Sequence, residues 1–351
     1  MPATRAASLA AAVVLYALVV VLQVTTDSWH IPSVLVAVPA VAALGSGPGT
    51  ILAAAAVAVA TRWAFALGEP GRTATAVGTT AAVLGIAALG CFVVRRREQA
   101  AALLVSITSV AESAQRAVLR PVPAAVGPVS IAAGYRAAAE HAGIGGDFYA
   151  VADTAFGLRA LIGDVRGKGL DAVTTAAVVL GAFYEAAHDE PGLAALAGRL
   201  DTSLRRFLTD PEAFATAALV AIGPDGATCA LSCGHPPPLL LRGATAAELP
   251  AAPGLPLGLG VLAGGGPEPG PAVRLRPGDA LLLYTDGLTE TRDRAGAFYP
   301  LLPRLTARPV PAAPQAVVDW LQQDAERFAG GVRDDDSALL VLAWEPPGDR
   351  S

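Results

Sequence analysis

The sequence predicts two unlike parts, an α-helical transmembrane N-terminal region followed by an α+β cytoplasmic domain. Residues 1–94 hold few charged side chains and several long apolar runs, whereas from Arg95 onward the composition is that of a soluble domain. Beyond residue 128, many short apolar runs alternate with turn residues, and the helical patterns are grouped together. This order is typical of layered α+β domains and not of a parallel βαβ array.

The overall composition fits a membrane protein of bacterial type and excludes several other classes. The chain has 351 residues, 53% of them hydrophobic and 16% charged, against about 25% charged in an average globular domain. The formal net charge of −5 argues against a nucleic-acid partner. The three cysteines form no CxxC pair, which speaks against a structural zinc site and a disulfide framework.

Four apolar runs predict transmembrane helices in the membrane region, residues 1–94. The first and last runs carry no charge, the third contains Arg62, and the second is short and contains two prolines. A helix needs about 20 apolar residues to cross a bilayer, and Arg62 needs a partner or must reach the interface. The predicted spans are about 8–24, 31–45, 50–67 and 74–94.

The arginines after the last run predict the topology. Arg95, Arg96 and Arg97 follow the span directly, which places this end in the cytoplasm by the positive-inside rule. Four spans put Arg5 on the cytoplasmic side and three put it outside; we favour four. Because more apolar runs follow the first, a cleaved signal peptide is a poor explanation. We therefore expect a multi-pass protein of the bacterial cell membrane with a cytoplasmic C-terminal domain.

Residues 95–120 form a predicted connector helix, which Pro121 and Pro123 end. Its apolar side chains recur every three or four residues, as in an a/d heptad seam. Such a seam suits a parallel homodimer that transmits motion, or a helix that packs on its own domain, and both alternatives stay open. The seam comprises Ala100, Leu103, Ile107, Val110, Ala114 and Ala117.

The cytoplasmic domain, residues 121–345 with a short tail at 346–351, is predicted from apolar periodicity. Three segments have the helical period, at 169–188, 192–208 and 312–329. The runs that predict strands lie at 129–137, 148–154, 158–165, 215–223, 227–234, 238–243, 272–277, 280–287 and 337–344.

Aspartates stand at the ends of four of these strands or just before them. Asp147 follows two glycines, Asp164 lies in IGDVRGKG, Asp286 precedes Gly287, and Asp334–Asp336 precede the last strand. Glycine lets the backbone approach a ligand, and acids gathered at one edge repel one another unless cations neutralise them. Oxygen ligands alone suit Mg²⁺ or Mn²⁺ rather than zinc.

Each of these motifs has a simpler explanation when it is taken alone. A single Asp-Gly is usually a turn, and three consecutive aspartates are often a solvated loop. The stretch around Lys168, the only lysine of the chain, does not match a Walker loop, because three residues instead of four separate its glycines and Gly169 follows the lysine. Only the combination of the four acidic sites favours a metal site.

Seven motifs in this order make the chain similar to the bacterial sporulation-stage-II-E-like phosphatases, a branch of the metal-dependent protein phosphatase 2C (PPM) type. The resemblance covers about residues 113–344 and leaves the membrane region out. It implies an α/β-β/α layered β-sandwich with two Mn²⁺ or Mg²⁺ ions at one edge. The motifs are IGGDFYA, IGDVRGKGLDA, FATAALV, CGHPPPLLL, GLPLG, LRPGDALLLYTDGLTETRD and DDSALLVL.

The resemblance also implies roles for individual residues. Asp164 matches the carboxylate that bridges both ions, and Val165 would lend its backbone carbonyl. Asp286 matches a ligand of one ion, and Asp147 contacts the ions directly or through water. In the last motif, alignment on the apolar residues makes Asp335 the ligand with Asp336 as its neighbour, whereas alignment on Ser337 selects Asp334; we favour Asp335.

Three further side chains near these motifs have open roles. Arg166 and Lys168 lie close enough in sequence to Asp164 to contact a substrate phosphate, or they are solvated loop charges. His235, in CGHPPP, is either a general acid or, as we prefer, a histidine of a turn.

The resemblance implies a membrane-tethered phosphatase that hydrolyses phosphoserine or phosphothreonine on a regulatory protein, for example an anti-sigma-factor antagonist. A hydroxide that bridges the two ions would attack the phosphorus. The alternative is a catalytically silent receptor or scaffold with a phosphatase fold that binds signalling partners. Because all four acidic sites are filled, we favour the enzyme.

Overall fold

The structure is a computed structural model of the whole chain. It describes residues 2–26, 31–67, 73–137, 145–208, 213–260, 267–307, 310–331 and 335–345. The chain divides into two compact units, Met1–Ile107 and Thr108–Ser351.

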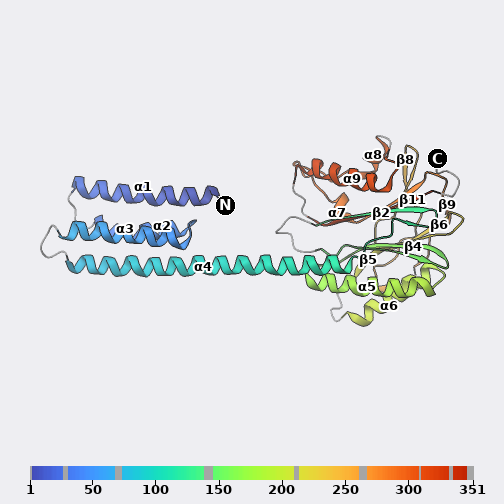
Figure 1. Cartoon of the computed structure of the whole chain (residues 1–351), viewed down its shortest axis with the longest axis horizontal. Coiled ribbons are helices and arrows are strands. Elements are labelled where there is room, and N and C mark those ends of the chain that lie inside the picture. Colours follow the sequence, from blue (N-terminus) through green and yellow to red (C-terminus); the bar gives the residue numbers. More distant parts are fainter. Residues whose placement is uncertain are drawn as a thin grey trace. The chain divides into compact units, whose positions relative to one another are not determined.

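Three long apolar helices make up most of the first unit (Figure 1). They are α1 (Pro2–Thr26), α3 (Pro48–Leu67) and α4 (Thr73–Val118). Each contains a stretch that is long and apolar enough to cross a membrane, at Ala6–Thr25, Pro48–Leu67 and Thr73–Gln99. Apolar side chains such as Val14 and Leu89 are exposed on these helices, as expected of surfaces that face lipid.

The second apolar run folds into shorter pieces than a membrane span needs. A 3₁₀-helix, η1 (Ile31–Val36), leads into α2 (Ala37–Ala43), which has only 7 residues. Seven helical residues rise only about 10 Å, and Pro39 lies within them. The number of membrane crossings therefore stays a prediction.

Two polar side chains of α3 are hydrogen-bonded to threonines of α4. Arg62 is 3% exposed, and its Nη2 donates to Oγ1 of Thr75 over 2.7 Å. The indole N–H of Trp63 donates to Oγ1 of Thr80 over 3.1 Å. Hydroxyl partners of this kind compensate part of the cost of a buried polar group in an apolar surrounding. Arg62, for which the sequence required either a partner or a position at the interface, thus has a hydrogen-bond partner on α4.

The predicted boundary between the last span and the connector is not a break in the helix. α4 continues for 46 residues to Val118, just before Pro121 and Pro123. The side chains of the heptad seam lie outside the described residues, so dimerisation through this segment stays a prediction.

Two antiparallel sheets form the core of the second unit. The first sheet has the order β1-β2-β11-β10-β7-β8 and the second β3-β4-β5-β6-β9. The strands of the first sheet are β1 (Ala125–Val126), β2 (Val129–Arg136), β11 (Ser337–Trp344), β10 (Ala280–Tyr284), β7 (Leu239–Arg242) and β8 (Thr245–Glu248). Those of the second are β3 (Phe148–Thr154), β4 (Gly157–Val165), β5 (Ala215–Ile222), β6 (Ala227–Cys233) and β9 (Val273–Arg274).

Helices cover the outer face of each sheet, which gives four layers (Figure 1). α5 (Leu170–Asp189) and α6 (Leu193–Phe207) pack on the second sheet, and α8 (Leu301–Thr306) and α9 (Pro314–Ala329) on the first. A third apolar cluster lies between the sheets and includes Ile162, Leu283 and Leu340. Because β11 is covered on both sides, all its residues are buried. The α/β-β/α layering predicted for this domain is confirmed.

The structure differs from the sequence prediction at one functionally important strand end. The predicted strand 280–287 stops at Tyr284, and Asp286 opens a short helix, α7 (Asp286–Thr289). Thr285 still donates its N–H to the carbonyl of Ala338 over 3.1 Å, and its hydroxyl bonds another carboxylate instead of capping the helix, so the pairing ends only where α7 begins at Asp286. β1, β8 and α8 were not predicted, and the predicted strand 272–277 is reduced to β9.

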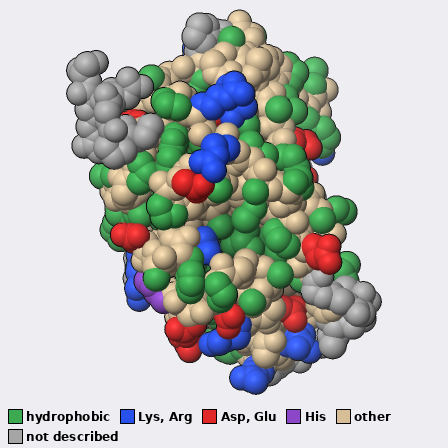
Figure 2. Space-filling view, turned by 90° about the vertical axis from the view of Figure 1, so that its right-hand side faces the viewer, with side chains coloured by type: hydrophobic (Ala, Val, Ile, Leu, Met, Phe, Trp, Pro, Cys, Tyr) green, Lys and Arg blue, Asp and Glu red, His purple; other side chains and the backbone are tan. Residues whose placement is uncertain are grey.

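The surface of the domain carries mixed charge on the face shown in Figure 2. Apolar side chains gather near the middle of this face, and acidic and basic side chains lie interspersed around them. α7 lies at the opposite end of the domain (Figure 1), and the candidate site is built around it.

Candidate metal centre

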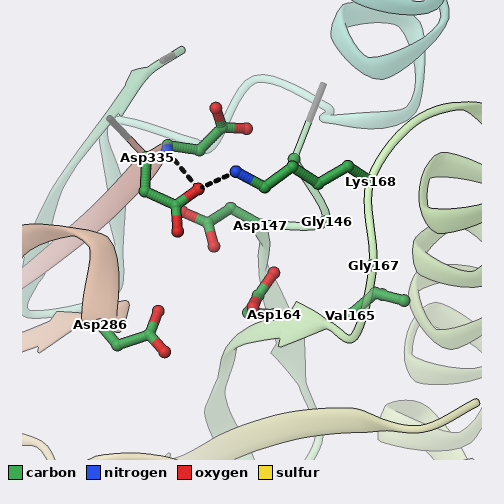
Figure 3. A pocket seen from close by; sticks show the side chains of 10 residues that line it. Gly146, Asp147, Asp164, Val165, Gly167, Lys168, Asp286 and Asp335 are labelled. Carbon is green, nitrogen blue, oxygen red and sulfur yellow. Dashed lines mark hydrogen bonds and ion pairs between the residues drawn. The ribbon is translucent and has the colours of Figure 1, made fainter. Parts of the chain in front are cut away.

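A small acidic cavity of about 180 Å³ lies where the two sheets meet. Figure 3 shows the carboxylates of Asp147, Asp164, Asp286 and Asp335 around a common space. The structure therefore brings the four predicted acidic sites together. The lining residues are Gly145, Gly146, Asp147, Asp164, Val165, Gly167, Lys168, Asp286, Asp335 and Asp336.

Both sheets contribute acids to this cavity. Asp164 lies near the end of β4 and Asp147 just before β3, and these strands pair in the second sheet. Asp286 follows β10 and Asp335 precedes β11, which pair in the first sheet. Strand pairing thus places Asp147 beside Asp164 and Asp286 beside Asp335, and the packing of the two sheets brings these two pairs of acids together.

Gly146 permits the close approach of two of these segments. Its carbonyl accepts the N–H of Val165 over 3.3 Å. A Cβ at residue 146 would lie 2.6 Å from the carbonyl oxygen of Val165 and 2.7 Å from its Cβ. The glycine before Asp147 is therefore required by space at the centre of the site.

Thr285 orients the buried carboxylate of Asp147, which is 4% exposed. The Thr285 hydroxyl donates to Oδ2 of Asp147 over 2.7 Å and accepts the N–H of Ala338 over 2.9 Å. One threonine thus connects the end of β10, the start of β11 and the acid from the other sheet.

The three consecutive aspartates have different surroundings. Asp336 is buried and accepts a hydrogen bond from the Tyr135 hydroxyl. Asp335 is about half exposed and pairs with the Lys168 ammonium, whose Nζ lies 2.8 Å from Oδ1. Asp334 lies outside the described residues.

Burial and mutual repulsion raise the pKa values of these acids. Burial and then the charges of Asp286 and Asp335 raise the pKa of Asp164 to about 7. Burial and then Asp164 raise the pKa of Asp147, and burial and then Asp335 raise that of Asp286. Such a cluster favours either protons or divalent cations, because each neutralises the crowded charge.

The donor set fits hard divalent cations. The carboxylate oxygens around the cavity are ligands that Mg²⁺ and Mn²⁺ prefer, and Val165, whose carbonyl is a predicted ligand, is among the lining residues. Within the described ranges, no three His, Cys, Asp or Glu side chains converge tightly enough to hold one ion by themselves.

Two other side chains for which the sequence left a role at the site open make contacts elsewhere. Arg166 is exposed, and its guanidinium lies over the ring of Phe214, 5.7 Å from the centroid. His235 is buried, with Nδ1 2.9 Å from the Thr216 hydroxyl and Nε2 3.1 Å from the carbonyl of Tyr284. It is a turn histidine, as preferred from the sequence, and not a group that faces the cavity.

Sequence reasoning missed Thr285 and Tyr135. Thr285 stands directly before the Asp-Gly pair, and its small hydroxyl was the available signal. Tyr135 had no local signal, because it meets Asp336 across the pairing of β2 with β11, 201 residues along the chain.

Comparison with known proteins identifies the domain. Residues 154–345 match the family model of stage II sporulation protein E (SpoIIE). No curated protein matches the chain.

Solved phosphatase structures share the fold. The RsbU and RsbW domains of a Mycobacterium tuberculosis protein are 29% identical, with a TM-score of 0.51, and the match covers 63% of this chain and 61% of that one. The SiaA-PP2C domain of Pseudomonas aeruginosa is 19% identical, with a TM-score of 0.57, over 71% of this chain and 99% of that one. The PP2C phosphatase domain of SpoIIE from Bacillus subtilis, with a fragment of its regulatory domain, is 22% identical, with a TM-score of 0.51, over 61% and 63%.

The fold of the second unit is thus that of the PP2C-type phosphatases, as the layered sheets and the acidic cavity between them suggested. The family model spans more than half of the sequence. The chain therefore belongs to the stage II sporulation protein E family.

Proposed function

We propose that this chain is a membrane-tethered, metal-dependent protein phosphatase that hydrolyses phosphoserine or phosphothreonine on a regulatory protein. The observation that carries the proposal is the convergence of acids from both sheets on one cavity, which Val165 also lines. Family membership supports the reaction class, and the three apolar helices of the first unit support the tether.

The proposed ligands follow from the surroundings of each acid. Asp164, in the middle of the set, would bridge two Mn²⁺ or Mg²⁺ ions, with the Val165 carbonyl beside it. Asp286 would bind one ion, and Asp147, held by Thr285, would act directly or through water. Asp335 is preferred in the last motif, because Asp336 is buried and already accepts from Tyr135.

The chain itself would bind and orient the phosphoryl group. Bound ions supply charge neutralisation and an activated water, so no protein nucleophile is required. Lys168 lines the cavity and can exchange Asp335 for a phosphate oxygen, whereas Arg166 is a weaker candidate because its guanidinium lies over Phe214. His235 is not a general acid, since both its ring nitrogens are hydrogen-bonded inside the protein.

The substrate proposal is a phosphorylated regulator of the anti-sigma-factor antagonist type. It is supported by the family and by the Mycobacterium tuberculosis relative, which contains RsbU and RsbW domains. We assign residues 1–94 to the membrane, 95–120 to a connector that would allow a homodimer, and 121–345 to the phosphatase domain facing the cytoplasm.

The test is metal-dependent hydrolysis by the full-length chain in detergent micelles. Turnover of a small phosphate ester and of phosphothreonine peptides would be measured with Mn²⁺, with Mg²⁺ and with excess chelator. We expect activity with a metal, none with the chelator, and a loss of at least about 100-fold in Asp164→Asn and Asp286→Asn. Folded protein that binds Mn²⁺ and hydrolyses neither substrate would favour the scaffold alternative.

A further inference from the structure

His235 occupies a special position behind the acidic cavity. Its side chain is 5% exposed and lies between β5 of the second sheet and β10 of the first. Nδ1 is 2.9 Å from Oγ1 of Thr216, and Nε2 is 3.1 Å from the carbonyl oxygen of Tyr284. The imidazole thus joins the two sheets by a hydrogen bond at each nitrogen.

The partners define which nitrogen carries the proton. A carbonyl oxygen only accepts, so Nε2 must donate to Tyr284. Burial lowers the pKa of His235 to about 4, which leaves the ring neutral near pH 7. Nδ1 is then without a proton and accepts from the Thr216 hydroxyl. Neither nitrogen is left to exchange a proton with a substrate.

The carbonyl of Tyr284 requires this donor because strand pairing ends beside it. β10 pairs with β7 only as far as Leu282 opposite Leu239. Continuing the same register would place Pro237 opposite Tyr284, within the run Pro236–Pro238. Proline has no N–H to give, and a buried carbonyl without a donor is costly. The His235 ring replaces the missing backbone donor.

Both partners of His235 lie next to the acids of the cavity. Thr216 stands directly opposite Asp164 in the pairing of β4 with β5. Tyr284 precedes Thr285, which holds Asp147, and Asp286, which opens α7. A shift of either partner would therefore move a proposed metal ligand on each sheet.

The turn that carries His235 is itself fixed. The Ser232 hydroxyl donates to the carbonyl of His235 over 2.7 Å, and the N–H of His235 donates to Oγ of Ser232 over 3.1 Å. Gly234 has φ +70°, and a Cβ there would lie 2.7 Å from Cγ of Pro256. The ring is thus held in place before any ligand binds.

We propose that His235 is a positioning residue, which holds the strand ends bearing Asp164 and Asp286 at the separation that two divalent cations require. This proposal rests on the proposed phosphatase site but concerns its geometry and not its substrate. The acids on the two sheets repel one another, so a link between the sheets directly behind them keeps the cavity ready for the ions. Residues that orient metal ligands typically contribute about 10–100-fold to metal affinity or activity.

The experiment measures Mn²⁺ binding by the full-length chain in detergent micelles. The Mn²⁺ concentration that gives half of the maximal thermal stabilisation is determined for the wild type, His235→Phe and His235→Gln, together with the kcat and KM for a small phosphate ester. Phe keeps the ring without its nitrogens, whereas Gln keeps one donor and one acceptor. Thr216→Val removes the hydrogen bond to His235 together with the 3.4 Å contact of the hydroxyl with the backbone carbonyl of Asp164, and Thr216→Ser retains both.

Tyr299→Phe is the matched control. It removes another buried side-chain hydrogen bond, from the Tyr299 hydroxyl to Asp324 over 2.8 Å, on the α9 side of the first sheet. We expect His235→Phe to raise the Mn²⁺ midpoint at least about 10-fold and to lower kcat with little change in KM. Thr216→Val should act in the same direction, and Gln and Ser should restore part of the effect. Tyr299→Phe should lower the melting temperature without moving the midpoint.

The remaining outcomes also decide the question. An unchanged midpoint in His235→Phe, or an equal shift in Tyr299→Phe, would overturn the proposal, because the histidine would then support only general stability. If His235→Phe does not fold, Thr216→Val decides by the same criterion. If the wild type binds Mn²⁺ but has no phosphatase activity, the proposed function fails while the midpoints still judge His235. A wild type that does not bind Mn²⁺ would overturn both proposals.

Discussion

Replacing Asp164 by asparagine should make the metal-free protein more stable, although it removes a proposed metal ligand. Without cations, the folded protein keeps Asp164 among other carboxylates, and its pKa rises from 3.8 to about 7. A raised folded-state pKa means that ionisation opposes folding. The cost is absent below about pH 4, grows as the pH rises toward 7, and is complete above that.

The size of this effect follows from the shift of roughly 3 pH units, at about 1.36 kcal/mol per unit. The upper limit is about 4 kcal/mol, and because water reaches part of the side chain we expect about 2 kcal/mol. For a domain of this size, that corresponds to a rise of about 4–8 °C in melting temperature.

The assay is thermal unfolding of the full-length chain in detergent with excess chelator, followed by tryptophan fluorescence, to which Trp320 and Trp344 of the second unit contribute beside Trp29 and Trp63. Asp164→Asn should melt higher than the wild type at pH 8, and the difference should fall to less than half at pH 5. Added Mn²⁺ should reverse the order. Asp153→Asn, at an exposed position on β3, is the control and should change stability by no more than about 0.5 kcal/mol. An Asp164→Asn protein that is less stable than the wild type in chelator at pH 8 would refute the electrostatic reasoning.

Three further predictions follow from the same cavity. Gly146→Ala should weaken Mn²⁺ binding at least about 10-fold in a thermal titration, because its Cβ would lie 2.6 Å from the Val165 carbonyl oxygen; an unaltered titration would show that the segments can move apart freely. Lys168→Gln should change the melting temperature little, since an ion pair between half-exposed side chains contributes about 0–1 kcal/mol, but should raise the KM for a phosphorylated protein; an unaltered KM would leave Lys168 as a loop charge. The apparent affinity for Mn²⁺ should increase between about pH 6 and 8, because cations must displace protons from acids whose pKa is raised; calorimetric titrations in buffers of different ionisation enthalpy would detect the released protons, and a flat pH profile would contradict the prediction.

The layers of the domain could be predicted from the sequence because local patterns determine them. The period of apolar residues located α5, α6 and α9 and most of the strands. The glycines beside Asp147 and Asp286 indicated the cavity, because a close approach of two backbone segments requires glycine and is therefore visible in the sequence. The convergence of the acids on one site could be predicted by assuming that the strand ends that carry them lie at the same edge of the domain.

The hydrogen bonds that hold the acids and their strands in place could not be predicted, because they depend on which strands pair and in what register. Thr285 meets Asp147 across 138 residues of sequence, and His235 meets Tyr284 across 49. The end of β10 was misplaced for a related reason. Thr285 has high strand propensity and its N–H still pairs with the carbonyl of Ala338, so only the contact of its hydroxyl with the distant Asp147 distinguishes it from an ordinary strand residue.

The single lysine of the chain makes the loop beside this site a unique target for a lysine-specific reagent. Lys168 lies about half exposed in the glycine-flanked loop that lines the cavity, and its side chain contacts Asp335. A protease that cleaves only after lysine therefore has one target bond in the whole sequence, before Gly169. The rate of that single cut would report directly on this loop in the intact chain. Metal or phosphate bound in the cavity should slow the cut, so ligand occupancy becomes readable as two fragments on a gel without labelling any residue.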